Sequence, residues 1–188
     1  MKKLLSLLSL TVLLQATTLT AQPAPEKDAE GYVSGQILLT DNSTVSGTIK
    51  DNIRKKGEVT VLRDGKKTKY KAGEINSVQI GSSNYITNNY TFYEIIWQGK
   101  NITLLCKANE PSGVQYNGVE PVVVSSGEGD IDDYFVKKAT DASLYLLDRK
   151  TAKDVLGKFC SSCVATIDAV KFDITAIKKA VESCDTCK

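Results

Sequence analysis

The 188-residue sequence contains no histidine. This absence excludes the Ser-His-Asp and Cys-His arrangements that activate nucleophiles, and every metal site that needs an imidazole ligand. Carboxylate pairs and lysines can still transfer protons, so a hydrolase built on carboxylates stays a weak alternative. We therefore expect a non-enzymatic protein with no cofactor, and we assign no catalytic residue.

Long hydrophobic runs are also scarce. One apolar run, at residues 4–14, follows Met1-Lys2-Lys3, and it is shorter than the roughly 20 residues that a membrane-spanning helix needs. A basic start followed by a short apolar run is typical of a secretory signal peptide. We expect the signal at residues 1–21 and no membrane span. The predicted location is outside the cytosol, whether periplasmic, associated with the outer envelope or secreted.

Net charge is low once the signal is removed. The chain has 24 basic and 22 acidic residues, and residues 1–21 hold two of the lysines and no acid. The remaining 167 residues, enough for one ordinary domain, carry a charge of about zero. A neutral chain gives no general case for binding nucleic acid.

Charge is nevertheless uneven along the chain. Residues 50–74 contain four acids and nine bases, which are Lys50, Arg54, Lys55, Lys56, Arg63, Lys66, Lys67, Lys69 and Lys71. Residues 110–133 contain six acids and no base. Either stretch is most simply a solvated surface, with lysines protecting strand edges. The functional alternative for the first is a basic face for an anionic glycan or protein partner.

The acidic stretch has its own alternatives. Its carboxylates could hold calcium through oxygen ligands, although they lack the spacing of a helix-loop-helix calcium site. They could also be read as a glycosidase pair, but nothing in the sequence fixes their separation. The candidate calcium ligands are Glu128, Asp130, Asp132 and Asp133.

Residue patterns predict an antiparallel β-domain at residues 31–150, after a flexible linker at 22–30. Apolar residues alternate with polar ones in short segments, and turn residues such as Asp64-Gly65 separate them. Many short strands indicate a β-sandwich or a partly open small barrel. The expected strands are 33–39, 45–49, 58–62, 67–70, 74–80, 92–97, 102–106, 134–138 and 144–148, with a short edge strand at 122–124.

After residue 150 the pattern becomes helical. Thr151 and Asp173 are candidate N-caps for a first and a third helix, and a second helix is expected at 164–170. The apolar spacing of the third helix places Cys184 on its inward face. The fold class is therefore α+β, with two or three short helices in a tail at 151–188.

Four of the five cysteines form two Cys-x-x-Cys motifs, Cys160 with Cys163 and Cys184 with Cys187. In a cytosolic protein this pattern would indicate a four-thiolate zinc site, whereas export favours disulfides. A thiol–disulfide redox protein is a further alternative. Disulfides would staple the tail, with three connectivities open to them. Cys106 is left over, and we expect a free, buried thiol.

Aromatic and amide residues are concentrated at 84–93. If exposed, Tyr85, Tyr90 and Tyr93 could stack against a glycan. The interpretation we favour is a hairpin loop that feeds aromatic rings into the core. Asn89 and Asn101 begin Asn-x-Thr patterns, which matter only in a eukaryotic secretory pathway.

Several segments follow one another along the chain: Gly31-Tyr-Val-x-Gly-x-Ile-Leu-Leu, Asp64-Gly-Lys-Lys, Phe92-Tyr-Glu-Ile-Ile, Asp133-Tyr-Phe-Val-Lys-Lys and the cysteine tail. In this succession the chain resembles a group of uncharacterised secreted proteins of Bacteroidetes-type bacteria. The resemblance implies a Cys163–Cys187 disulfide and brings no known reaction. Cys160 and Cys184 would then form the second pair, which departs from the pattern of the family and is not implied by the resemblance.

Together these observations predict a non-enzymatic secreted or envelope protein that binds a protein or glycan partner. The alternative is a cysteine-dependent protein that binds zinc or exchanges disulfides.

Overall fold

The computed structural model describes residues 30–111, 114–116, 121–123, 128–160 and 172–187. Its strands are β1 (Tyr32–Leu39), β2 (Thr44–Asn52), β3 (Glu58–Arg63), β4 (Lys66–Lys71), β5 (Ile75–Ile80), β6 (Ser83–Asn88), β7 (Thr91–Gln98), β8 (Ile102–Lys107), β9 (Val114–Tyr116), β10 (Pro121–Val123), β11 (Tyr134–Lys138) and β12 (Leu144–Leu147). Its helices are α1 (Ile53–Lys56), the 3₁₀ turn η1 (Ala72–Glu74), α2 (Ala152–Phe159) and α3 (Ile174–Thr186).

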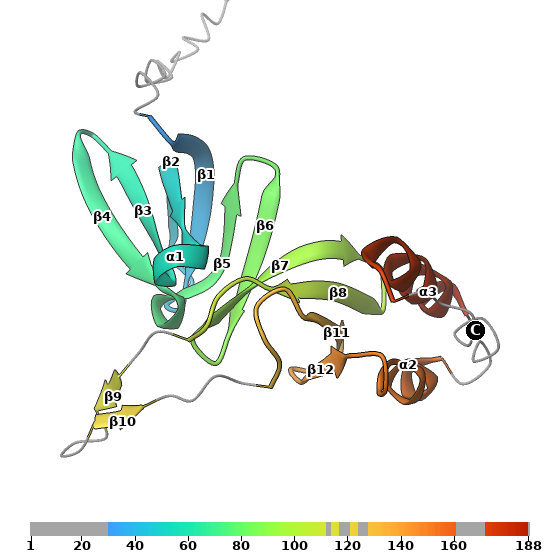
Figure 1. Ribbon diagram of the computed structural model, residues 1–188. Coiled ribbons are helices and arrows are strands. Elements are labelled where there is room, and N and C mark those ends of the chain that lie inside the picture. The colour runs from blue at the N-terminus through green and yellow to red at the C-terminus, as the bar shows by residue number, and fades with distance from the viewer. Residues whose placement is uncertain (1–29, 112–113, 117–120, 124–127, 161–171, 188) are drawn as a thin grey trace, which may run out of the picture.

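Ten strands form one antiparallel sheet in the order β12-β11-β8-β7-β6-β5-β1-β2-β3-β4. Strands β9 and β10 pair only with each other and project from the rest (Figure 1). No pairing joins β4 to β12 among the described strands, so the sheet is open. The expected α+β class, an antiparallel sheet followed by helices, is confirmed.

The first half of the sheet curls around its own core. Ile37, Ile49, Val61 and Phe92 are fully buried there, and Ile53 of α1 packs against the same cluster. The curl brings backbones close together: a Cβ built on Gly35 would lie 2.3 Å from the carbonyl oxygen of Gln79. Glycine is therefore required at this position, because no side chain fits between the strands.

Helices α2 and α3 cover the same face of the second half of the sheet. Leu156 of α2 and Val181 of α3 pack with Ile102, Leu104 and Val136 in a second core. The predicted N-cap of the last helix is confirmed, since the Asp173 carboxylate accepts a hydrogen bond from the backbone N–H of Ala176. Cys184 faces inward, as its spacing predicts.

The opposite face of the sheet, which we call the outer face, carries the alternate side chains. Tyr32, Lys50, Thr60 and Lys69 form one row on this face, because they are direct pairing partners across β1, β2, β3 and β4. Farther along the sheet, Tyr93, Leu105 and Phe135 form a third, smaller apolar cluster on the same face.

The structure confirms most of the expected strands and adds β6, β9 and α1, which the sequence patterns did not predict. The helix expected at 164–170, the signal at 1–21 and residues 22–29 of the linker lie outside the described residues. No helix in the described part of the chain has the length and apolar character needed to cross a membrane.

Candidate functional site

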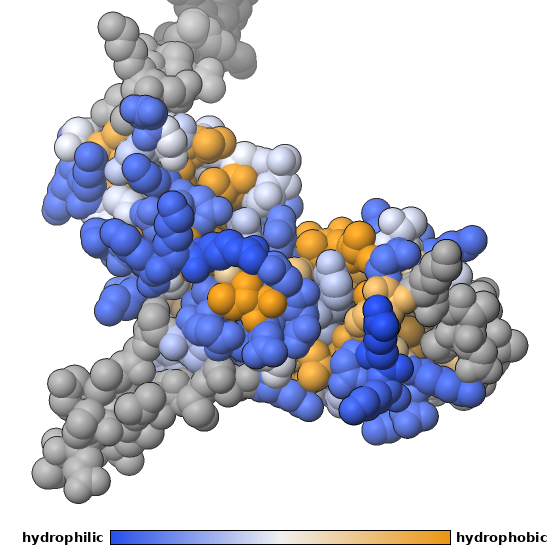
Figure 2. Space-filling view, viewed as in Figure 1, coloured by the Kyte–Doolittle hydropathy of each residue, from blue (hydrophilic) through white to orange (hydrophobic). Residues whose placement is uncertain are grey.

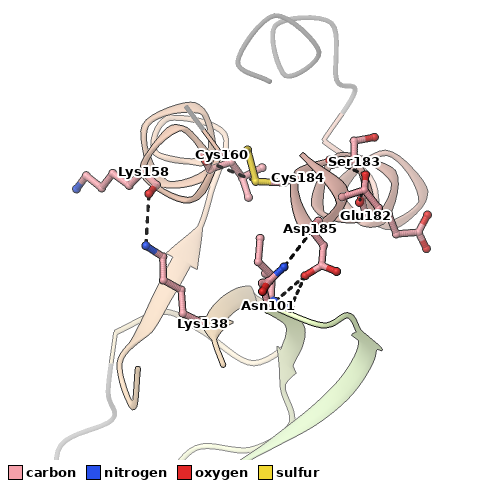
Figure 3. Close-up of a disulfide and its surroundings, with 11 residues drawn as sticks. Asn101, Lys138, Lys158, Cys160, Glu182, Ser183, Cys184 and Asp185 are labelled. Atoms are coloured by element: carbon pink, nitrogen blue, oxygen red, sulfur yellow. Dashed lines mark hydrogen bonds between the residues drawn. A yellow bond between two sulfur atoms is a disulfide. The ribbon is translucent and has the colours of Figure 1, made fainter. Parts of the chain in front are cut away.

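The cysteine tail contains a buried disulfide between Cys160 and Cys184 (Figure 3). Cys160 ends α2 and Cys184 lies in the last turns of α3, so the bond ties the two helices together. Cys187 is also disulfide-bonded, and Cys163, the partner that the resemblance implies for it, lies outside the described residues.

The disulfide bears directly on the zinc alternative. A four-thiolate zinc site needs Cys160, Cys163, Cys184 and Cys187 as thiolates. In this structure the sulfurs of Cys160 and Cys184 are bonded to each other, so neither is a thiolate. The described residues contain no group of three or more histidine, cysteine or acidic side chains placed to hold a metal ion.

Cys106 is the free cysteine among the described residues, and it is half-buried. It pairs across strands with Glu94 of β7 and Tyr134 of β11. Burial, followed by the negative charges of Asp132 and Glu94, raises the pKa of the thiol to about 11. Cys106 is therefore protonated at neutral pH, the opposite of what a catalytic or redox cysteine needs.

The glycan-stacking alternative required exposed rings, and two of the three tyrosines are buried. Tyr85 is 8% exposed and belongs to the core of the curl, and Tyr93 is 4% exposed and packs edge-to-face on Phe135. Burial in the core raises the pKa of Tyr85 to about 12, with the nearby carboxylates of Asp51 and Glu94 adding to the effect. Tyr90 is partly exposed, and its ring lies against Gly73. Because the rings fill the core, they offer no open stacking surface.

The carboxylates of the acidic stretch are not grouped into a cation site among the described residues. Asp132 forms a bidentate ion pair with Arg54 of α1, in which the Arg54 Nη1 to Asp132 Oδ1 distance is 2.8 Å. That guanidinium lowers the pKa of Asp132. Asp133 accepts the backbone N–H of Asp130 at 2.7 Å, so it fixes the local turn. The calcium interpretation of Glu128, Asp130, Asp132 and Asp133 therefore finds no cluster of carboxylates here.

The basic stretch forms a real surface, which we call the lysine face: Lys50, Lys67 and Lys69 around Tyr32 on the outer face of β1–β4. The ammonium nitrogens of Lys50 and Lys67 each lie 5.8 Å from the centre of the Tyr32 ring. Lys69 pairs with the buried Glu58 at 3.0 Å. Within the described residues, neither Lys50 nor Lys67 forms an ion pair with a carboxylate. Both ammonium groups lie over the Tyr32 ring and are exposed to solvent.

Hydroxyl and amide groups surround the lysine face, on the exposed sides of β1 and β2. They are Ser34, Gln36, Ser46, Thr48 and Asn52. Figure 2 shows hydrophilic residues over the β3–β4 hairpin and hydrophobic residues in small, separate patches. The lysine face is thus a polar, cationic surface. The aliphatic side chain that β1 carries on the same outer face is Leu38, which is 36% exposed.

Sequence reasoning found the basic residues but missed how they are grouped. The signal was the alternation of β4, in which Lys67, Lys69 and Lys71 fall on one face. The partner ring, Tyr32, comes from a strand more than 30 residues earlier, and only the sheet order brings it beneath the lysines.

Comparison of the chain with protein families, with curated proteins and with solved structures gives no match.

Proposed function

We propose that the protein is a non-enzymatic exported protein, of the cell envelope or secreted, that binds an anionic glycan through the lysine face. The observation that carries this proposal is the convergence of Lys50 and Lys67 over Tyr32 without an acidic partner among the described residues. Two ammonium groups held over one ring attract a carboxylate or sulfate group without having to break an existing ion pair.

The surroundings of the lysine face favour a glycan over a protein partner. The centre of a protein interface is usually built from apolar and aromatic anchors that fill pockets. Here the groups around the lysines are hydroxyls and amides, which suit the hydroxyl groups of a sugar chain. The ring of Tyr32 is buried under the lysines and offers no anchor of its own.

Features of the sequence and of the structure support export and the absence of catalysis. Residues 1–21 have the pattern of a signal peptide, and a disulfide such as Cys160–Cys184 persists in oxidising compartments. The chain has no histidine, and the free thiol of Cys106 is protonated at neutral pH.

The finer architecture is part of the proposal. Strands β5-β1-β2-β3-β4 curl around one core, and Gly35 and Gly47 allow close approach on the inside of the curl. We take this unit to be a partly open small barrel rather than one half of a sandwich. Its outer wall carries the lysine face.

The test is binding of defined polyanions to the protein without its signal. Affinity for polygalacturonate and heparin would be measured by calorimetry for the unmodified chain and for the Lys50→Gln/Lys67→Gln double variant. Loss of two charge-assisted contacts worth about 1–2 kcal/mol together should weaken binding by roughly fivefold to thirtyfold and reduce its salt dependence.

The matched control is Lys178→Gln/Lys179→Gln, which removes the same charge from the exposed side of α3. Binding by this variant should stay within about twofold of the unmodified chain. Equal losses in both variants would show that only net charge matters, and that result, or no binding of either polyanion, would overturn the proposal.

A further inference from the structure

A second polar surface lies on the outer face, far along the sheet from the lysine face. It is a hollow of about 400 Å³ between the β6–β7 turn and the β11–β12 hairpin. The lining residues are Asn88, Asn89, Tyr93, Glu128, Phe135, Ala142, Ser143 and Leu144. None of these residues is basic, so the hollow does not suit an anion.

The floor of the hollow is apolar. Tyr93 and Phe135 meet edge-to-face with ring centres 5.3 Å apart, and Leu144 packs against the same cluster. The rings are almost fully buried, so they present edges rather than faces to a ligand. Such a floor can contact the C–H groups of a sugar ring without providing a stacking platform.

The rim of the hollow is polar, and three of its side chains have no partner in the described part of the chain. Among the described contacts, the side chains of Asn88, Asn89 and Glu128 make no hydrogen bond or ion pair. The two amides and the carboxylate together offer donors and acceptors in one small space. Asn89 and Tyr90 both adopt left-handed backbone conformations, with φ of 46° and 63°, and form the turn that directly follows Asn88.

A buried lysine fixes the remaining part of the rim. Lys107 is fully buried, and its ammonium group donates to the Glu110 carboxylate and to the backbone carbonyl of Gly129. A buried charge is costly unless it is paired in this way. The lysine thereby holds residue 129 against the sheet, and with it the neighbouring Glu128 at the edge of the hollow.

We propose that this hollow is a second binding site, which takes an uncharged pyranose unit of a glycan. Amide groups can donate to and accept from the hydroxyl groups of a sugar, and a carboxylate accepts from them. The apolar floor accommodates the less polar side of the pyranose ring. A metal ion would lack ligands, because Glu128 is the one carboxylate in the lining. The proposal does not rest on the lysine face, since the two surfaces share no residue.

The experiment measures binding of three neutral probes, cellohexaose, maltohexaose and chitohexaose, by calorimetry and by ligand-observed NMR. We expect at least one of them to bind. Asn88→Ala and Glu128→Gln should each weaken that binding about tenfold, which corresponds to the loss of roughly 1.4 kcal/mol per hydrogen-bonding group. Ala142→Leu, at an exposed lining position, should block the hollow without entering the core.

Asn84→Ala is the matched control, because Asn84 is an exposed amide on the same strand outside the hollow. It should bind the probe as the unmodified chain does, and all variants should keep the same melting temperature within about 2 °C. Absence of binding by all three probes, or equal binding by the Ala142→Leu variant, would overturn the proposal. The Lys50→Gln/Lys67→Gln variant should bind the neutral probe normally, so failure of one proposal is distinguishable from failure of the other.

Discussion

At the scale of single residues, position in the sheet decides what a side chain can do. Cys106 and Tyr85 have side chains that often react or recognise ligands, yet both are held inside the sheet with raised pKa values. Gly35 is conspicuous in the sequence only as an interruption of an alternating strand. In the structure a Cβ at this position would lie 2.3 Å from the carbonyl oxygen of Gln79 on β5, so the site admits no side chain.

Cys106 should react slowly with iodoacetamide at pH 7.5. Because burial raises its pKa from 9.0 to about 11, the thiolate fraction falls about a hundredfold relative to an ordinary thiol. The rate, followed by mass spectrometry, should still be rising at pH 10, and Cys106→Ser should abolish this labelling. A plateau in the rate near pH 9 would contradict the burial argument.

The same shift has a consequence for stability. Between pH 9.0 and about 11 the thiol of Cys106 ionises in the unfolded chain but stays neutral in the folded protein. The free energy of unfolding is therefore unaffected by this group below pH 9.0 and falls as the pH rises toward 11. The free energy of unfolding should therefore fall less over this range in Cys106→Ala than in the unmodified chain.

Gly35→Ala should destabilise the protein by about 1–3 kcal/mol, as overpacked substitutions in tight sites do. The new Cβ would lie 2.3 Å from the Gln79 carbonyl oxygen and 2.8 Å from a side-chain carbon of Ile49. Urea unfolding would measure the loss. Ser46→Ala, on the exposed side of β2, is the control and should change stability by less than about 0.5 kcal/mol.

At the scale of secondary-structure elements, the sequence predicts what has local periodicity. The Asp64-Gly65 hairpin and the helix capped by Asp173 follow from neighbouring residues and are confirmed. Strand β6 was missed because Ser83–Asn88 is mostly polar, and its hydrogen bonds to β5 and β7 decide its conformation. The pairing of β1 with β5 joins residues some 40 positions apart, which no local pattern encodes.

The candidate sites follow the same rule. The lysines of the lysine face were visible in the sequence, but strand order places Tyr32 next to them. The amides at the rim of the hollow were visible too, but buried Lys107 holds Glu128 near them through Gly129. For Tyr93 the sequence favoured a core position over a glycan contact but could not decide between them, because a run of aromatic residues does not reveal which face of the sheet is covered.

Asp185 joins α3 to the β7–β8 hairpin, and its loss should be measurable. The carboxylate accepts the backbone N–H groups of Lys100, Asn101 and Ile102 at 2.6–2.9 Å. Figure 3 shows Asp185 beside Asn101. Asp185→Asn should cost about 1–3 kcal/mol in thermal or urea unfolding, since amides replace charge-assisted acceptors. Glu182→Gln, in an exposed pair on the same helix, should have almost no effect.

The pH dependence of this contact has a definite sign. Desolvation opposes the ionised form, but the three N–H groups outweigh it and lower the pKa of Asp185. Its stabilisation is therefore complete above about pH 4 and lost as the pH falls through the lowered pKa. The difference in stability between the unmodified chain and Asp185→Asn should shrink at pH 2; a constant difference would argue against the hydrogen bonds as its source.

At the scale of the whole molecule, one sheet supports two cores in different ways. The curl encloses its core with strands, whereas the second core depends on α2 and α3 lying over β8 and β11. The disulfide joins the ends of those helices across 24 residues. The two cores should therefore respond differently when the disulfide is removed.

Cys160→Ala/Cys184→Ala should loosen the helical layer before the curl. The chain-entropy model assigns about 3 kcal/mol to closing a loop of this size. Hydrogen exchange should show faster exchange over residues 152–160 and 172–187, with β1, β2 and β3 still protected. Uniform loss of protection would show that the two cores unfold as one unit.

The exposed lysines of β4 have an effect beyond ligand binding. β4 is an end strand of the open sheet, so its backbone could pair with the edge of another molecule. Charged lysines oppose such edge-to-edge contact. Neutralising them by mutation, acetylation or a bound polyanion should therefore increase self-association. The oligomeric state of each lysine variant should be measured together with its binding.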